Sequence, residues 1–228
     1  MTGAGASEFF DAQAAWYDGE YDEQTASGRV LRARTEAVLS VLGSTPGSVL
    51  DAGMGGGRLC AELDRLGWDV TGIDASSEMV ALARERLPHL ESRLLEGRIE
   101  RLPLADGSMD AVVATGVLEY VDELEAAVRE LARVLRAGGI AALSIPAPGA
   151  PHTVWRLRVV YPLVRIAKAA IPFGRPAPPA RPLLTSAAFE AALEAAGLTV
   201  DRVLRVGARP NPGRLRTRQL VYAARKAR

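Results

Sequence analysis

The sequence predicts an α/β protein, in which a doubly wound, mostly parallel sheet carries helices on both faces. Three observations lead to this fold class. Strand-like and helix-like apolar patterns alternate from about residue 48 to residue 145, a cluster of glycines directly follows the first strand, and an aspartate ends the second. Ligands of such sheets bind beyond the carboxyl ends of the strands, so the glycines and the aspartate are expected to share one site.

The elements are expected in a regular order. Helices over residues 7–17 and 28–42 come first, because their apolar side chains recur at helical spacing. The alternating segments follow as strand 48–52, helix 57–66, strand 69–74, helix 76–87, strand 93–96, strand 110–115, helix 122–136 and strand 139–145. Gly138 and Gly139 are interpreted as the C-terminal stop of the helix over 122–136.

The pattern changes after residue 145, where prolines and arginines become frequent. Residues 153–170 are predicted to be helical, with Pro162 kinking the helix or starting a new one. Thr185 or Ser186 is expected to cap a helix that ends before a glycine. Residues 198–206 and 219–224 are predicted to form a final antiparallel pair of strands.

Composition excludes several classes of protein. The chain has 228 residues, 48% of them hydrophobic, and no apolar stretch long enough for a membrane span. The N-terminal residues lack the basic and apolar parts of a signal peptide, and a single cysteine, Cys60, excludes an internal disulfide, so a cytoplasmic protein is expected. The net charge is +1, but acidic side chains outnumber basic ones in residues 1–130, and basic side chains outnumber acidic ones in residues 131–228.

The glycine cluster has the features of a nucleotide site. Four glycines occur among residues 53–57, and Asp74 follows about 20 residues later, where a ribose-binding carboxylate belongs. Two departures argue against a dinucleotide. Arg58 stands where the dinucleotide motif has its third glycine, and Asp51 would repel a pyrophosphate but could receive an ammonium group. A nucleoside that carries a cationic amino acid therefore fits better.

Five segments, in order, resemble the motifs of class I S-adenosylmethionine-dependent methyltransferases, and within these the small-molecule and quinone-type branch. The segments are residues 49–63, 70–80, 102–113, 117–121 and 134–139. The resemblance covers roughly residues 45–145. It implies a Rossmann-like sheet of seven strands with an antiparallel last strand, and S-adenosylmethionine as the cofactor, with S-adenosylhomocysteine as the product.

The resemblance divides the chain into four parts. Residues 1–44 form an N-terminal helical cap, residues 45–145 the cofactor-binding core, and residues 146–184 a proline-rich basic lid insertion. Residues 185–228 complete the same domain with a helix and a strand pair.

The resemblance also assigns roles to individual residues. Backbone amides of the glycine loop are expected to hold the methionine part of the cofactor, with Asp51 near its ammonium. Asp74 takes the ribose hydroxyls, and Ala75 and Met79 flank the adenine. Arginine stands at position 98, where relatives carry an acid for the adenine amino group, so that contact is lost or moves to the next acid. The expected cofactor-binding residues are Tyr17, Asp51, Gly53, Gly55, Gly57, Asp74, Ala75, Met79, Ile99, Glu100 and Thr115. No cluster of His, Cys and carboxylate residues suggests a metal.

Catalysis is expected to rest on orientation of the two substrates for in-line displacement, because the sulfonium is already an activated methyl donor. His152, just past the fifth strand, is the favoured general base. Tyr120 stands where relatives often carry histidine and is expected to line the acceptor pocket. Residues 153–170 combine an apolar stripe with a basic one, so this helix could cover a hydrophobic anionic acceptor or contact a membrane surface.

The sequence thus predicts methyl transfer to an oxygen of a hydrophobic or anionic small molecule. Two alternatives stay open. The basic C-terminal third permits RNA methylation, although no RNA-binding module is visible. The arginine at position 98 and the absence of a certain base also permit a protein that binds the cofactor without catalysis. The acceptor and the oligomeric state are left open.

Overall fold

The computed structural model describes residues 4–19, 21–22, 26–147, 184–207 and 219–227. Nearly all of the expected lid insertion, with His152 and the helix expected over 153–170, lies outside these residues. Within the described parts, no helix is long and apolar enough to cross a membrane.

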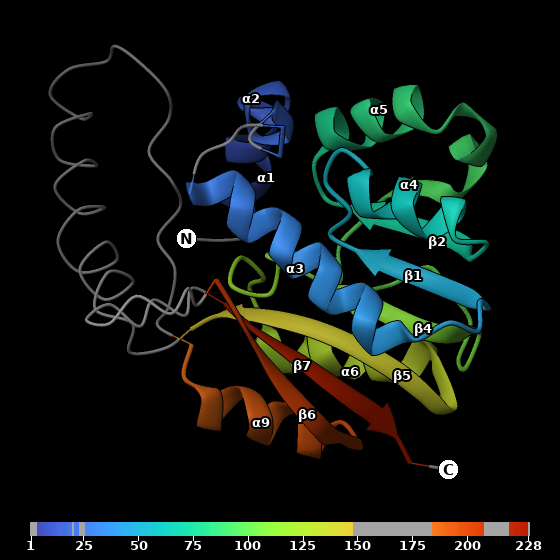
Figure 1. The fold of residues 1–228 in the computed structure, drawn as a ribbon, viewed down its shortest axis with the longest axis vertical. Helices are drawn as coiled ribbons and strands as arrows, with labels where there is room; N and C mark the ends of the chain where they lie inside the picture. Colours follow the sequence, from blue (N-terminus) through green and yellow to red (C-terminus); the bar gives the residue numbers. More distant parts are fainter. Residues whose placement is uncertain (1–3, 20, 23–25, 148–183, 208–218, 228) are drawn as a thin grey trace, which may run out of the picture.

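A seven-stranded sheet forms the centre of the molecule, in the order β3-β2-β1-β4-β5-β7-β6 (Figure 1). The strands are β1 (Ser48–Ala52), β2 (Asp69–Asp74), β3 (Leu94–Glu96), β4 (Met109–Ala114), β5 (Leu135–Pro146), β6 (Leu198–Val206) and β7 (Gln219–Lys226). Strands β1 to β5 pair in parallel, whereas β7 runs antiparallel to both β5 and β6. The expected seven-stranded sheet with a reversed last strand is confirmed.

Helices cover both faces of the sheet because successive strand residues point to opposite sides. Val49 packs in one apolar core with α3 (Ala26–Leu42), α4 (Arg58–Arg65) and α5 (Ser77–Arg86). Its neighbour Leu50 packs in the other core, with α6 (Leu124–Val134) and α9 (Ser186–Ala195). Figure 1 shows α3 crossing one face, with α6 and α9 on the other. This is the predicted doubly wound arrangement.

The N-terminal residues differ from the expectation. The single helix predicted over 7–17 is two short helices, α1 (Ala4–Asp11) and α2 (Ala14–Gly19), separated by a turn. The turn lets the rings of Phe10 and Tyr17 meet edge to face, with their centroids 5.4 Å apart. The helical periodicity predicted the segment but not the break, since the break depends on packing against the rest of the protein.

Gly138 and Gly139 are not the helix stop that was expected. Helix α6 already ends at Val134, and both glycines lie inside β5. Leu135 pairs with Met109 whereas Ile140 pairs with Ala111, so the glycines belong to an irregular stretch of β5. Gly138 has φ +73° there, a left-handed conformation that glycine adopts without strain.

The C-terminal elements agree with the sequence. Thr185 caps α9 by accepting a hydrogen bond from the Ala188 N–H at 3.1 Å, and Gly197 follows the helix with φ +76°.

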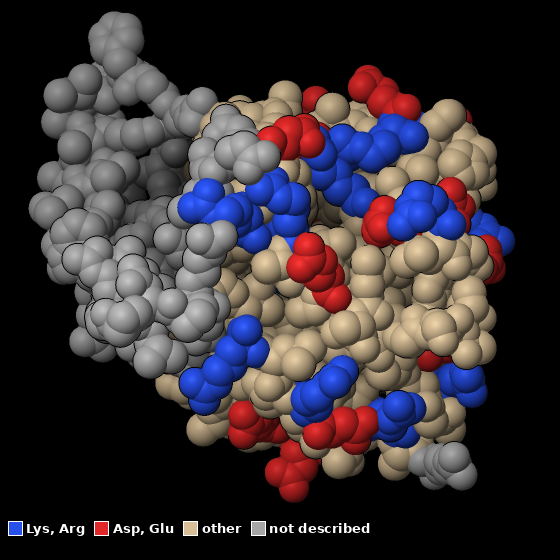
Figure 2. Space-filling view, in the orientation of Figure 1, with Lys and Arg blue, Asp and Glu red and all other residues tan. Residues whose placement is uncertain are grey.

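The separation of acidic and basic residues along the chain does not produce separate acidic and basic regions on the face that Figure 2 shows. Figure 2 shows basic and acidic side chains interspersed over this face of the molecule.

Candidate functional site

A pocket lies beyond the carboxyl ends of β1, β2 and β4, partly covered by α1 and α2 (the N-terminal cover, residues 4–19). It holds about 1000 Å³ of space, part of it open to solvent. Most of the predicted site residues line it, although they come from distant parts of the chain. These are Tyr17, Asp51, Gly53, Gly55, Asp74, Ala75, Met79, Ile99, Glu100, Thr115 and Tyr120.

Two predicted residues are not among those that line the pocket. The N–H of Gly57 donates to the Met54 carbonyl at 3.1 Å, and a Cβ on Gly57 would lie 2.9 Å from that of Ala83. This glycine therefore lets the loop pack closely on α5. His152 lies outside the described residues, so its predicted role as a base stays a prediction.

The glycine loop forms a sharp turn directly after β1. Gly53 and Gly55 have φ +76° and +54°, and a Cβ on Gly53 would lie only 2.5 Å from Cγ2 of Val117. The N–H groups of Gly53 and Met54 both donate to the Ile73 carbonyl, at 2.7 and 3.1 Å. These two loop amides, which were expected to help hold the methionine part of a cofactor, are thus already engaged within the protein.

Asp74, at the end of β2, is held in place by the backbone. Its two carboxylate oxygens accept from the Gly55 N–H at 2.8 Å and the Ser76 N–H at 2.9 Å. Each oxygen keeps a second lone pair, so the carboxylate can still accept two hydroxyl hydrogens, as a ribose diol requires. Burial raises the pKa of Asp74.

Asp51, the second-last residue of β1, is a buried carboxylate with 1% of its surface exposed. The Cys60 thiol lies 3.3 Å from Oδ2 and donates a weak hydrogen bond to it. Burial raises the pKa of Asp51 to about 7, and among the described residues the structure records no ion pair at this carboxylate. A ligand ammonium would supply the charge that the site lacks.

The expected adenine side holds apolar and charged groups together. Met79 is 2% exposed, and its sulfur lies 3.9 Å from where a Cβ on Gly55 would be. Glu100 Oε1 accepts from Arg98 Nη2 at 2.9 Å and from the Asp122 N–H at 3.0 Å. Glu100, which was expected to take over the adenine contact, is therefore held by Arg98, the arginine that stands where the resemblance predicts an acid.

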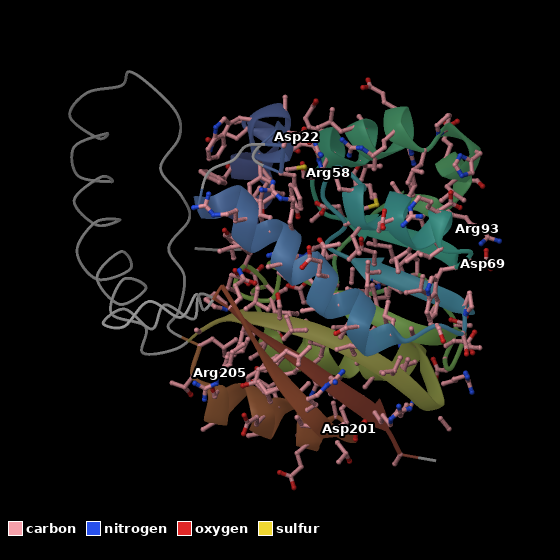
Figure 3. All side chains as sticks on the ribbon, viewed as in Figure 1. Asp22, Arg58, Asp69, Arg93, Asp201 and Arg205 are labelled. Carbon is pink, nitrogen blue, oxygen red and sulfur yellow. The ribbon has the colours of Figure 1, made fainter. Side chains whose placement is uncertain are left out.

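The N-terminal cover is fixed over the pocket by aromatic and ionic contacts. Phe10 meets Tyr120 edge to face, with centroids 5.0 Å apart, so Tyr120 lies under the cover as well as in the pocket. Asp18 forms ion pairs with Arg58 and Arg86, each at 2.8 Å. Figure 3 shows Arg58 beside Asp22, with which it forms a further pair at 2.6 Å.

The sequence reasoning missed Arg34, a buried arginine of α3 that lines the same pocket. It is 3% exposed, and it donates to the Tyr21 hydroxyl at 3.1 Å and to the Gln219 side-chain oxygen at 3.4 Å. A signal for it was present. Leu31, Arg34 and Val38 follow helical spacing, so the arginine interrupts an apolar stripe that faces the protein interior.

Comparison with known proteins agrees with this geometry. Residues 50–143 match the model of the methyltransferase domain family. The chain is 37% identical over 143 residues to malonyl-acyl-carrier-protein O-methyltransferase of Pectobacterium atrosepticum, an alignment that covers 63% of this chain and 53% of that protein. It is 40% identical over 146 residues to demethylmenaquinone methyltransferase of Beutenbergia cavernae, covering 62% and 59%. The chain thus spans little more than half the length of these two relatives.

A solved structure shares the fold over nearly the whole chain. It is an S-adenosylmethionine-dependent methyltransferase from Thermotoga maritima, described as a possible histamine N-methyltransferase. The TM-score is 0.68 at 19% identity, and the match covers 96% of this chain and 98% of that one. At this identity the likeness concerns the fold alone.

Proposed function

We propose that the protein is a class I S-adenosylmethionine-dependent methyltransferase that transfers a methyl group from this cofactor to a small molecule, because residues 50–143 match the methyltransferase domain family. The observation that carries the proposal is the position of two acids, the buried Asp51 and the half-buried Asp74, in the lining of one pocket beside the glycine loop. One acid suits an ammonium group and the other a ribose diol. A nucleoside bearing an amino acid offers both.

The bound cofactor would supply an activated methyl group on a sulfonium, and the work of the protein is to bind, orient and exclude water. Asp51 would hold the amino-acid ammonium of the cofactor and Asp74 its ribose, while the N-terminal cover partly closes the pocket. Holding two reactants in the reactive geometry contributes up to roughly 7–11 kcal/mol to lowering the barrier. This contribution needs no general base.

We propose that the acceptor is hydrophobic or anionic and is methylated on oxygen. Phe10, Tyr17 and Tyr120 give the pocket an aromatic wall, which suits a hydrophobic acceptor. One relative is named for O-methylation of a malonyl group and another for methylation of a demethylmenaquinone. These names concern those proteins, and they support a small acceptor here.

His152 is proposed as the general base, with Tyr120 as a wall of the acceptor pocket. Burial raises the pKa of the neighbouring Tyr17 phenol, so a tyrosine in this setting stays protonated at neutral pH and is a poor base. His152→Ala should slow turnover and leave cofactor affinity intact. Full activity of this variant would remove histidine from the mechanism.

The proposal is tested by titrating the purified protein with S-adenosylmethionine and then incubating it with labelled cofactor and metabolite extracts. Saturable binding followed by label in a small molecule is the expected result, with Asp74→Ala as the binding-deficient control. Binding without turnover on any extract would favour a non-catalytic cofactor-binding protein. Label that ribonuclease releases would favour RNA methylation. Contact of residues 153–170 with membranes and a cytoplasmic location stay predictions.

A further inference from the structure

Two buried charges of opposite sign line one pocket. Asp51 and Arg34 are 1% and 3% exposed, and both lie on the pocket wall. They influence each other, since the Arg34 charge lowers the pKa of Asp51 against the larger raising effect of burial. Yet the structure records no ion pair between them. A ligand in this pocket therefore meets a fixed anion and a fixed cation that do not neutralise each other by contact.

The hydrogen bonds of Arg34 go to neutral partners. Its two terminal nitrogens donate to the Tyr21 hydroxyl and the Gln219 amide oxygen, at 3.1 and 3.4 Å. Burial by itself would lower the pKa of Arg34, but Tyr21, Tyr17 and Glu119 nearby raise it overall, so the side chain stays charged. A guanidinium has five N–H donors, which leaves donors for a carboxylate in the pocket.

The chain makes room for this guanidinium at Gly116, just after β4. Gly116 has φ +69°, and a Cβ on it would lie 2.3 Å from Nη1 of Arg34. Any other residue at this position would have to displace the guanidinium. The close approach therefore places Arg34 at the carboxyl ends of the strands, beside the predicted cofactor residue Thr115.

Most of the backbone donors that were expected to bind an anion in this region are already engaged. The N–H groups of Gly53 and Met54 are bound to Ile73, and that of Gly55 is bound to Asp74. A carboxylate that entered the pocket would lose its hydration and would need another donor. Among the described residues that line the pocket, Arg34 combines deep burial, positive charge and donors to spare.

We propose that Arg34 binds the carboxylate of the methionine end of S-adenosylmethionine, while Asp51 binds the ammonium of the same amino acid. This inference rests on the proposed function, because it takes S-adenosylmethionine as the cofactor. Asp51 and Arg34 together match an α-amino acid zwitterion, which carries one charge of each sign on neighbouring atoms. A planar guanidinium suits a carboxylate, because it can donate two parallel hydrogen bonds.

The test compares S-adenosylmethionine with decarboxylated S-adenosylmethionine, which keeps the amine and the sulfonium but lacks the carboxylate. Dissociation constants of both are measured by calorimetry for the wild-type protein, Arg34→Gln and Arg34→Lys. Arg34→Gln should weaken binding of S-adenosylmethionine roughly 10- to 100-fold and change binding of the decarboxylated compound less than about threefold. Arg34→Lys should be intermediate, since it keeps the charge but not the paired donors.

Two matched controls accompany these variants. Arg29→Gln removes an exposed arginine from the same helix and should leave both affinities unchanged. Asp51→Asn should weaken both compounds alike, because both carry the amine. Circular dichroism and a thermal melt check each variant, and if Arg34→Gln does not fold, the comparison is made with Arg34→Lys.

Equal losses for the two compounds, or no loss for either, would overturn the role of Arg34. Unchanged cofactor affinity with lost turnover would instead assign Arg34 to the acceptor and also overturn the proposal. Failure of the wild-type protein to bind either compound would contradict the proposed function itself. The two failures are therefore distinguishable.

Discussion

Replacing Asp51 with asparagine should stabilise the ligand-free protein at pH 7.5 while weakening its binding of S-adenosylmethionine. Burial raises the pKa of Asp51 from an ordinary 3.8 to about 7. The folded protein therefore keeps a proton that the unfolded chain releases near pH 4. The free energy of unfolding falls as the pH rises from about 4 to about 7, and it stays low above that range.

The size of the effect follows from the same rise in pKa. A difference of about three pKa units corresponds to roughly 4 kcal/mol of stability that the ionised carboxylate removes from the folded state above pH 7. Asparagine has nearly the same shape and can still accept from the Cys60 thiol, so it should recover part of this amount. Urea unfolding at pH 5 and pH 7.5 measures it, and the stabilisation should be clearly larger at the higher pH.

Cofactor affinity should have the opposite pH dependence and rise as the pH increases toward 7. An ammonium binds the ionised carboxylate, so the affinity of the wild-type protein should fall about tenfold for each pH unit below 7. Asp51→Asn should bind the cofactor weakly at every pH, and its affinity should hardly change with pH. Calorimetric titrations between pH 5.5 and 8.5 provide the measurement. A variant that is less stable than wild type at pH 7.5, or whose affinity keeps the wild-type pH dependence, would refute the reasoning.

Substitutions at three further positions test neighbouring parts of the site. Asp74→Ala should weaken cofactor affinity roughly 100-fold or more, because two charge-assisted bonds to the ribose are lost, and unchanged binding would show that another group holds the ribose. Cys60→Ala should move the pH dependence of cofactor affinity upward, since the thiol lowers the pKa of Asp51, whereas Cys60→Ser should keep the wild-type midpoint. Gly53→Ala should lower the free energy of unfolding by roughly 2 kcal/mol, because its Cβ would overlap Val117, and a thermal melt without a shift would contradict this.

The strands of the first half could be predicted closely from the sequence. The predicted bounds of β1 and β2, 48–52 and 69–74, agree with the structure, and the helices after them differ by one or two residues. Short apolar runs bounded by glycine or proline define a buried parallel strand locally, so no knowledge of the rest of the fold is needed. The reversed β7 came from the resemblance rather than from such a pattern.

The errors concern features that distant contacts decide. The break between α1 and α2 brings Phe10 onto Tyr17 and Tyr120, and nothing in the local periodicity indicates it. The two glycines of β5 have the composition of a helix stop, but pairing with β4 places them in an irregular strand instead. In both cases the tertiary structure overrides a correct local preference.

The site was predictable to the extent that its groups follow strand ends. Asp51 is the second-last residue of β1 and Asp74 the last of β2, and parallel strands bring such residues to one edge of the sheet. Arg34 could not be placed in this way, because it reaches the pocket from α3, where its guanidinium occupies the space that a side chain at position 116 would fill.

A buried charge within an apolar helical stripe nevertheless carries information. Desolvation of a guanidinium costs several kcal/mol, and a fold has no reason to bear that cost for packing alone. The same argument applies to Asp51, whose pKa is raised mainly by burial. Two such residues of opposite sign at one pocket therefore point to a ligand that carries both charges, and the stability that the ligand-free protein gives up is regained when that ligand binds.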